Sequence, residues 1–158
     1  LDPDVLYWMI QTRPAPEVVQ TLRTGRLWGE PGAAALAAVA ATDGQLAAIA
    51  QSYEDMAAAA EADAMLEPDL AFHRRIAEAT GNDLMAYIGN MLSLALRESI
   101  KLSSRLPNTH ALSLPRHRAI LTALQNRDAA AAHQATVLQL DATQLDLSTV
   151  ISAGIDLH

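Results

Sequence analysis

The stretch Asp69-Leu70-Ala71-Phe72-His73-Arg74-Arg75-Ile76 decides how this chain folds and where its chemistry lies. At about 100° per residue, Asp69 and His73 are one helical turn apart in the middle of an apolar face. That face is formed by Leu66, Leu70, Phe72, Ile76, Ala77 and Ala79, and Thr80 shares its centre. The opposite, solvated face carries Arg74, Arg75 and Glu78. The pattern therefore predicts a helix that buries an ionisable pair.

Buried carboxylates and imidazoles need partners, because burying them unpaired costs several kcal/mol. Asp69 and His73 must be compensated by each other, by ordered water, by a metal ion or by a ligand. A second segment, from Leu112 to Arg127, repeats the feature, since His117 shares its face with Leu114, Ile120, Leu121 and Leu124. A lone inward histidine is usually a satisfied core residue, whereas three inward Asp and His side chains on two helices also fit a metal site. On the residues alone, both interpretations stay open.

The composition is that of a helical bundle. The 158 residues suffice for one domain and are too few for two. Hydrophobic residues make up 51% and aromatic residues only 4%, so alanine, leucine, isoleucine and valine supply most of the apolar volume. No strand-like alternation is found. We expect an all-α protein.

The charge and the termini narrow the setting. A net charge of −7 argues against these residues gripping a phosphate backbone, which requires clustered Lys and Arg. No apolar run reaches the roughly 18 to 20 residues of a membrane span, and there is neither a cysteine nor a signal peptide. The start, Leu1-Asp2-Pro3-Asp4, lacks an initiator methionine. We expect a soluble, cytoplasmic segment of a longer protein, with no membrane partner.

Capping and breaking residues divide the chain into helices. In the first part we expect a linker helix from Asp4 to Gln11, a helix from Glu17 to about Ala41 with a kink or break at Gly29-Glu30-Pro31-Gly32, and a helix from the Thr42/Gln45 capping box to about Met65. In the second part we expect a helix with Pro68 in its first turn that ends at Gly81, one from Asp83 to about Arg105, the His117 helix, and one from the N-cap Asp128 to about Ile151.

Three segments in this order resemble the FCD effector domain, the C-terminal half of FadR-type regulators of the GntR family. They are Arg26-Leu27-Trp28-Gly29-Glu30-Pro31, the stretch from Asp69 to Asn82, and the stretch from His117 to Asp128, and the likeness covers nearly the whole chain. The opening Leu1-Asp2-Pro3-Asp4-Val5-Leu6 is similar to the segment that leaves the winged helix in members that sense sugar acids such as galactonate.

This resemblance implies an antiparallel bundle of six to seven helices that forms a homodimer. Residues 1–15 would be a linker helix after an N-terminal winged helix-turn-helix, and residues 16–158 the effector-binding domain. A small carboxylate, either a sugar acid or another organic acid, would bind inside the bundle. Its binding would change the affinity for operator DNA, which only the N-terminal domain contacts.

The resemblance also implies a metal site. In metal-binding members an Asp and a His one turn apart are joined by two further histidines around a divalent cation, for which zinc or nickel is expected. Asp69, His73 and His117 match the first three positions, but the fourth falls on Gln139, whose amide oxygen is a poorer ligand than imidazole. His133 is no substitute, because it lies roughly 120° around the helix from Gln139. We therefore expect a weakened or remodelled metal site, or a metal-free polar floor.

An effector carboxylate in an acidic protein needs a cation, either the metal or an inward arginine. Arg97 either lines a pocket or faces water, and Arg26 either contacts the ligand or pairs with Glu30 one turn away. With Gln139, these two arginines are the candidate ligand-binding residues.

Two other classes of protein are the alternatives. A helical metal-dependent hydrolase would need adjacent His-Asp or Glu-x-x-His pairs, and neither occurs. No Ser/His/Asp trio or glycine-rich phosphate loop is present either, so we expect no enzyme and assign no catalytic residue. The remaining alternative is a dimerisation module in which Asp69, His73 and His117 satisfy one another without metal or ligand.

Overall fold

The computed structural model describes residues 8, 12–13, 15–103 and 109–152. This part of the chain is helical and contains no strand. Its helices are α2 (Ala15–Ala40), α3 (Asp43–Ala58), α4 (Ala62–Glu78), α5 (Asp83–Ser103), α6 (Thr109–Gln125) and α7 (Ala129–Ser152). The expected all-α bundle is confirmed.

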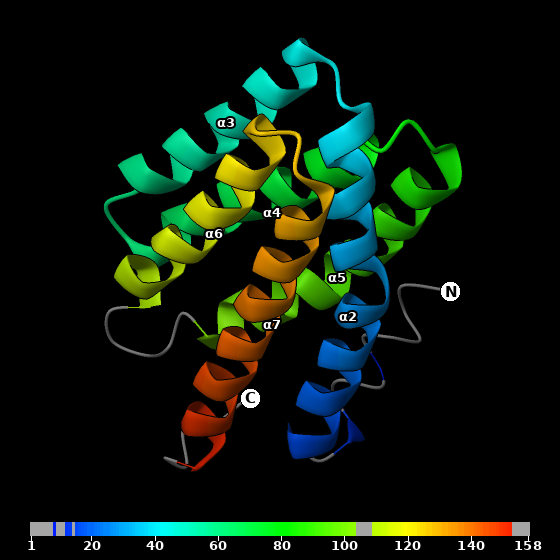
Figure 1. Cartoon of the computed structure of the whole chain (residues 1–158). Helices are drawn as coiled ribbons and strands as arrows, with labels where there is room; N and C mark the ends of the chain where they lie inside the picture. The colour runs from blue at the N-terminus through cyan, green and yellow to red at the C-terminus, as the bar shows by residue number, and fades with distance from the viewer. Residues whose placement is uncertain (1–7, 9–11, 14, 104–108, 153–158) are drawn as a thin grey trace.

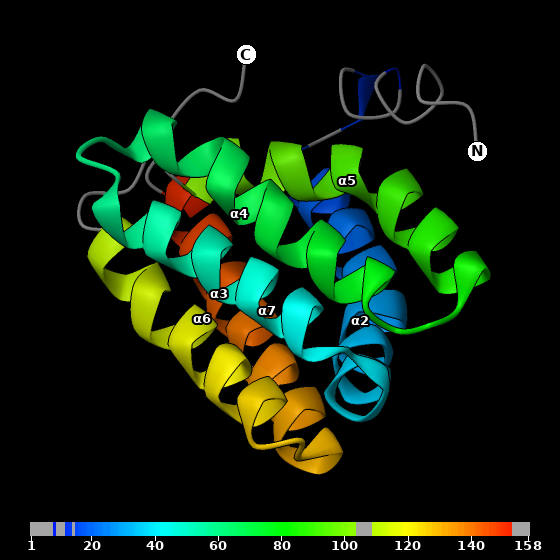
Figure 2. The ribbon, with the colours of Figure 1, turned by 90° about the horizontal axis from the view of Figure 1, so that it is seen from above.

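Successive helices reverse direction, so the bundle is antiparallel (Figure 1). Helices α2 and α7 pack along one another, α4 and α5 pack against α2, and α3 packs against α4 and α6. In the view from above, α4 lies among the other helices rather than at the end of the bundle (Figure 2). It contacts α2, α3, α5 and α6, and this central position brings its buried face against several elements at once.

The core lies on the faces that the helical periodicity predicts. Phe72 and Ile76 of α4 pack with Ile120, Leu121 and Leu124 of α6. From Ala33 to its end, the buried positions of α2 are all alanines, which let this part of the helix approach its neighbours closely. Because these side chains are small, functional side chains on α2 and α4 can lie near each other in the interior.

Most helix ends follow the predicted capping signals. The Thr42 side chain accepts a hydrogen bond from the Gln45 N–H, and the Gln45 side chain accepts one from the Thr42 N–H, so the capping box is present. Gly81 has φ of 68°, the left-handed conformation that ends the helix before it. Asn82 Oδ1 then accepts from the N–H of Leu84, and Asp128 Oδ1 accepts from the N–H of Ala131.

The boundary between α3 and α4 was predicted wrongly, and at Pro31 the break that was one of the two expected alternatives is absent. Helix α2 runs through Pro31 without a break, because one missing backbone donor is tolerated where the helix is packed on both sides. The helix that begins after Thr42 ends at Ala58 instead of near Met65, and Ala59 is extended, with no glycine or proline to mark the turn. As a result Pro68 lies inside α4, which begins at Ala62, and not in its first turn.

The predicted linker helix from Asp4 to Gln11 lies outside the described residues, apart from Trp8. Among the helices that are described, none combines the length and the apolarity needed to cross a membrane.

Candidate metal centre

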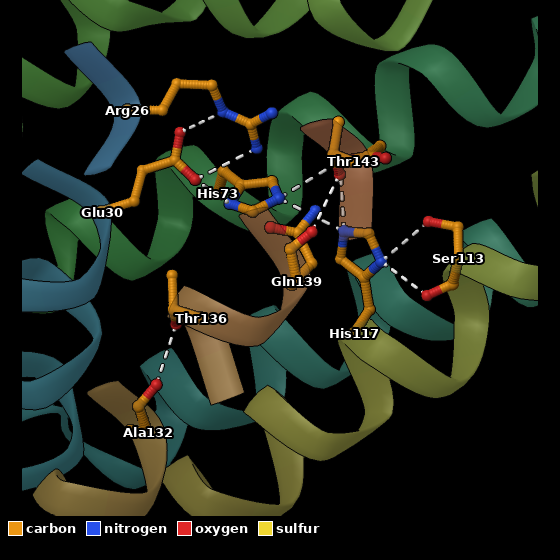
Figure 3. Close-up of polar contacts among 10 residues, drawn as sticks. Arg26, Glu30, His73, Ser113, His117, Ala132, Thr136, Gln139 and Thr143 are labelled. Atoms are coloured by element: carbon orange, nitrogen blue, oxygen red, sulfur yellow. Dashed lines mark hydrogen bonds and ion pairs between the residues drawn. The ribbon is translucent and has the colours of Figure 1, made fainter. Parts of the chain in front are cut away.

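The three predicted ligand residues converge in the interior. Asp69 and His73 come from α4, His117 comes from α6, and all three are buried. Each offers one ligand atom, and these atoms lie within 4.8 Å of one another. The His73 and His117 Nε2 atoms are 3.2 Å apart, and Asp69 Oδ1 lies 3.3 Å from the first and 3.4 Å from the second. Figure 3 shows the two imidazoles facing each other between the helices.

Helix geometry and a buried aromatic ring produce this convergence. The spacing of four residues puts Asp69 and His73 on the same face of α4, and the α4 to α6 contact adds His117. The fully buried ring of Phe72 meets both imidazoles edge to face, with centroid distances of 5.6 Å to His73 and 5.2 Å to His117. Phe72 therefore holds both rings in place and walls them off from water.

The hydrogen bonds of His117 fix its tautomer. Its Nδ1 lies 3.0 Å from the backbone oxygen of Ser113 and 3.1 Å from Ser113 Oγ. A carbonyl oxygen only accepts, so Nδ1 carries the proton and donates it. In the neutral ring the lone pair is then on Nε2, which faces Asp69 and His73.

His73 is oriented in the same way by a carboxylate. Its Nδ1 lies 3.3 Å from Glu30 Oε2 of α2. Glu30 is in turn held by Arg26, whose Nε donates to Oε1 at 2.7 Å and whose Nη2 donates to Oε2 at 3.2 Å. This chain of contacts, drawn in Figure 3, leaves the His73 Nε2 directed at the centre. Oxygen acceptors behind ligating histidines are the usual support of protein metal sites.

The donor set fits a divalent cation. Ligands about 2.1 Å from a common ion are separated from each other by roughly 3.0 to 3.4 Å, depending on the coordination angle. The three observed separations, 3.2, 3.3 and 3.4 Å, fall in that interval. Asp69 Oδ1 is fully buried and has no hydrogen-bond partner among the described residues. With both imidazoles neutral, three acceptor atoms thus meet, and either a proton on His117 or a divalent cation would compensate them.

Electrostatics ties the buried groups together. Burial by itself would raise the pKa of Asp69, but positive charge on His117 and His73 outweighs it and holds this pKa well below its usual range. Burial would lower the pKa of His117, but Asp69 outweighs it, so that the pKa of His117 is raised. Burial would also raise the pKa of Glu30, yet Arg26 and His73 lower it. The two lowered pKa values favour ionised Asp69 and Glu30, and the raised pKa favours a protonated His117.

Gln139 lies at the same centre. It is buried on α7, and Figure 3 shows its side chain beside the two imidazoles. Its Oε1 has no hydrogen-bond partner among the described residues, although it is an acceptor in the interior. His133 of the same helix is exposed, which confirms that it is no substitute ligand.

The two candidate arginines have different surroundings. Arg26 is almost fully buried and pairs with Glu30, so it supports His73 indirectly. Arg97 is part of the surface, where its Nη1 lies 2.7 Å from Glu67 Oε1. It lines a hollow with Glu67, Asn90 and other residues, and this hollow includes none of the three candidate ligands.

Sequence reasoning missed two features of the site. Glu30 was considered only as a partner of Arg26, and its contact with His73 depends on the packing of α2 against α4. The second feature is a cavity of about 40 Å³ lined mainly by α2, α4 and α5, and Glu30 and His73 both line it. The inward direction of Glu30 on an alanine-rich helix was a signal in the sequence for its contact with His73. The sequence contains no signal for the cavity.

With this geometry in view, the chain was compared with known proteins. Residues 26–142 match the sequence profile of the FCD domain. The chain belongs to the FCD domain family. It is 26% identical over 146 residues to the galactonate operon transcriptional repressor of Escherichia coli (strain K12), covering 89% of this chain and 62% of the repressor. The resemblance expected from the sequence is confirmed.

A solved structure gives the same result. Streptococcus agalactiae GntR superposes with a TM-score of 0.70 and 25% identity, covering 86% of this chain and 61% of that one. The chain therefore spans less than two thirds of the length of either relative. The repressor is named as a transcriptional regulator and not as an enzyme, which fits the expectation that the domain is no enzyme.

Proposed function

We propose that this domain is the ligand-sensing and dimerising part of a GntR-family transcriptional regulator, located in the cytoplasm. In this proposal residues 16–158 bind the effector, and residues 1–15 link them to a DNA-binding domain that reads the operator. The membership of the FCD family and the likeness to a named transcriptional repressor support it. The net charge of −7 is consistent with DNA contacts being made elsewhere in the regulator.

The observation that carries the proposal is the convergence of Asp69, His73 and His117. These residues would hold a divalent ion, zinc or nickel, and Gln139 would be a weaker fourth donor. When bound, the ion would supply the positive charge that attracts an effector carboxylate into the interior. Glu30 and Ser113 orient the imidazoles, and Phe72 keeps water away from them.

Signal transfer in this proposal follows from the helices that meet at the site. Four helices contribute to the site: α4 and α6 provide the ligands, α2 provides the supporting Glu30, and α7 provides the Gln139 amide. Occupation of the site therefore affects all four helices. A ligand that binds one arrangement of these helices better than another shifts the equilibrium between them. That shift would alter the spacing of the DNA-binding domains in a dimer.

Exposed apolar side chains support the dimer. Trp28, Leu36 and Val39 of α2 are all exposed, at 74, 46 and 72%. Large apolar side chains gathered on one helix are typical of surfaces that associate. Light scattering of the chain is expected to give twice the monomer mass. The Trp28→Asp variant is expected to give a lower mass than the wild type. A wild-type chain that is monomeric at all concentrations contradicts this part of the proposal.

The metal proposal is tested by the pair His117→Ala and His133→Ala, which change a buried and an exposed histidine. Calorimetric titration with zinc or nickel is expected to show one site in the wild type and in His133→Ala. In His117→Ala the affinity is expected to fall at least about 100-fold, since even residues behind the ligands contribute 10- to 100-fold. A wild type that takes up no ion, or equal affinity in both variants, contradicts it.

The effector is tested with the same proteins. The metal-loaded chain is unfolded thermally in the presence of each of a panel of organic acids. An acid of the true effector class should raise the free energy of unfolding by about 2.7 kcal/mol when its concentration is one hundred times its dissociation constant. If neither metal nor acid changes the unfolding, the alternative of a dimerisation module is favoured. The hydrolase alternative draws no support from the named relatives.

A further inference from the structure

A small cavity adjoins the candidate metal centre. Its walls come mainly from α2, α4 and α5, with one residue each from α6 (Ile120) and α7 (Thr136), and Glu30 and His73 line it directly. From α5 it takes Met85, Ile88, Gly89, Leu92, Ser93 and Leu96, which recur at the spacing of one helical face. His73 thus belongs both to the ligand set and to the cavity wall, so that a molecule bound at the centre would extend under α5.

The cavity offers few hydrogen bonds. Of its polar side chains, Glu30 and His73 already contact each other, and Arg74 is more than half exposed at the edge. Thr136 Oγ1 donates to the Ala132 oxygen at 2.9 Å, and Ser93 Oγ donates to the Asn90 oxygen at 2.6 Å. The remaining walls are alanine, glycine, leucine, isoleucine and methionine. Hydroxyl groups of a ligand would therefore lose their hydrogen bonds to water without gaining partners in the cavity. Methylene groups need no hydrogen-bond partner and would not have this cost.

The size of the cavity points the same way. Its volume of about 40 Å³ is enough for roughly three water molecules, and thus for a chain of about three or four heavy atoms. A six-carbon polyhydroxy acid, with about twelve or more heavy atoms, does not fit within this volume.

From these observations we infer that the effector is a short aliphatic monocarboxylate, whose carboxylate binds at Asp69, His73 and His117 and whose hydrocarbon chain lies under α5. The inference rests on the proposed function, because it names the substrate class of the same site. It sets the effector of this chain apart from galactonate, the compound in the name of the operon that the 26% identical relative represses.

The test is a calorimetric titration of the zinc-loaded chain with acetate, butyrate, hexanoate, octanoate and galactonate. Affinity is expected to rise roughly fourfold per added methylene from acetate to butyrate, as burial of apolar surface requires, and to fall by octanoate. Galactonate is expected to bind at least about tenfold more weakly than butyrate. The same series without metal is expected to bind more weakly throughout.

A pair of leucine variants on α5 sharpens the test. Leu92→Ala enlarges the cavity and is expected to move the preferred chain length up by about two or three carbons. Leu84→Ala makes the same change at an exposed position of the same helix and is expected to leave the series unchanged.

The possible outcomes separate the two claims. Galactonate binding more tightly than butyrate, or an affinity that does not depend on chain length in the wild type, overturns the aliphatic effector and leaves the metal-dependent sensor standing. Failure of every acid to bind the zinc-loaded chain overturns both. A chain-length optimum that Leu92→Ala shifts and Leu84→Ala does not shift supports the inference.

Discussion

His73 and His117 point their Nε2 atoms at each other across 3.2 Å, although the residues are 44 positions apart and belong to different helices. Behind each ring an oxygen faces Nδ1: Glu30 Oε2 lies 3.3 Å from that of His73, and the Ser113 backbone oxygen accepts from that of His117 at 3.0 Å. Two neutral rings would therefore oppose two lone pairs, which is repulsive. A proton or a metal ion between them removes the repulsion. The raised pKa of His117 favours the first of these, a proton on its ring. Asp69 stabilises the positive charge in both cases, whether it is that proton or a metal ion.

Gln139→His should strengthen metal binding. The buried Gln139 Oε1 has no hydrogen-bond partner among the described residues, and an imidazole is a better ligand for zinc or nickel than an amide. We expect the affinity for either ion to rise by roughly 10- to 100-fold, because even residues that only support the ligands change metal affinity by that much. Competition with a chromophoric chelator measures it.

The control for this gain is Gln134→His, which adds a histidine at an exposed position of the same helix. It is expected to leave the affinity within about twofold of the wild type. An unchanged affinity in Gln139→His would mean that α7 contributes nothing to the cation.

Glu30→Gln should weaken metal binding although Glu30 is no ligand. The amide keeps the shape of the side chain but removes the negative charge that faces the His73 Nδ1 and pairs with Arg26. We expect a loss of about 10- to 100-fold in zinc affinity, because such carboxylates orient the ring and raise its basicity. Glu67→Gln, which breaks only the exposed pair with Arg97, is the matched control. Equal affinities of the two variants would reduce Glu30 to a purely structural residue.

The local parts of the site could be predicted from the sequence because they follow from helix periodicity. The spacing of Asp69 and His73 fixes a common face on α4, and the apolar neighbours of His117 fix its inward direction on α6. Helix ends marked by a capping residue, such as Thr42, Gly81 and Asp128, were also predictable. Each of these features depends on residues within one or two turns.

Features that depend on packing between helices could not be predicted. Glu30 meets His73 only because α2 crosses α4, and the cavity exists only because α5 lies over both. Arg75 was expected on the solvated face of α4, but it is half-buried and turns toward α3. The chain also turns at Ala59 without a breaking residue, since α3 and α4 gain more by packing together than by continuing as one helix.

Arg75→Ala should destabilise the fold more than Arg74→Ala, its neighbour in sequence. Arg75 Nη1 donates to the Ala48 oxygen at 2.6 Å and to Ser52 Oγ, so it joins α4 to α3 and satisfies a partly buried carbonyl. We expect Arg75→Ala to lower the unfolding free energy by about 1.5 to 3 kcal/mol. Arg74 makes only an exposed ion pair with Glu78 at 3.6 Å, so its loss should stay within about 0.5 kcal/mol. Urea unfolding measures both, and equal effects would contradict the assigned role.

Gly89→Ala should separate α4 from α5. A Cβ at Gly89 would lie 2.5 Å from the Ala77 Cβ, too close for two methyl groups, so one helix must move. We expect the unfolding free energy to fall by about 1 to 3 kcal/mol, despite the better helix propensity of alanine. Gly32→Ala is the control, because no atom lies within 4 Å of its added Cβ, and it should stabilise α2 by about 0.5 to 1 kcal/mol. Adding Ala77→Gly to Gly89→Ala removes the opposing methyl group and should restore stability to within about 1 kcal/mol of the wild type, because the helix propensity gained at position 89 offsets that lost at position 77. Absence of that rescue would show that the two helices do not meet at this pair.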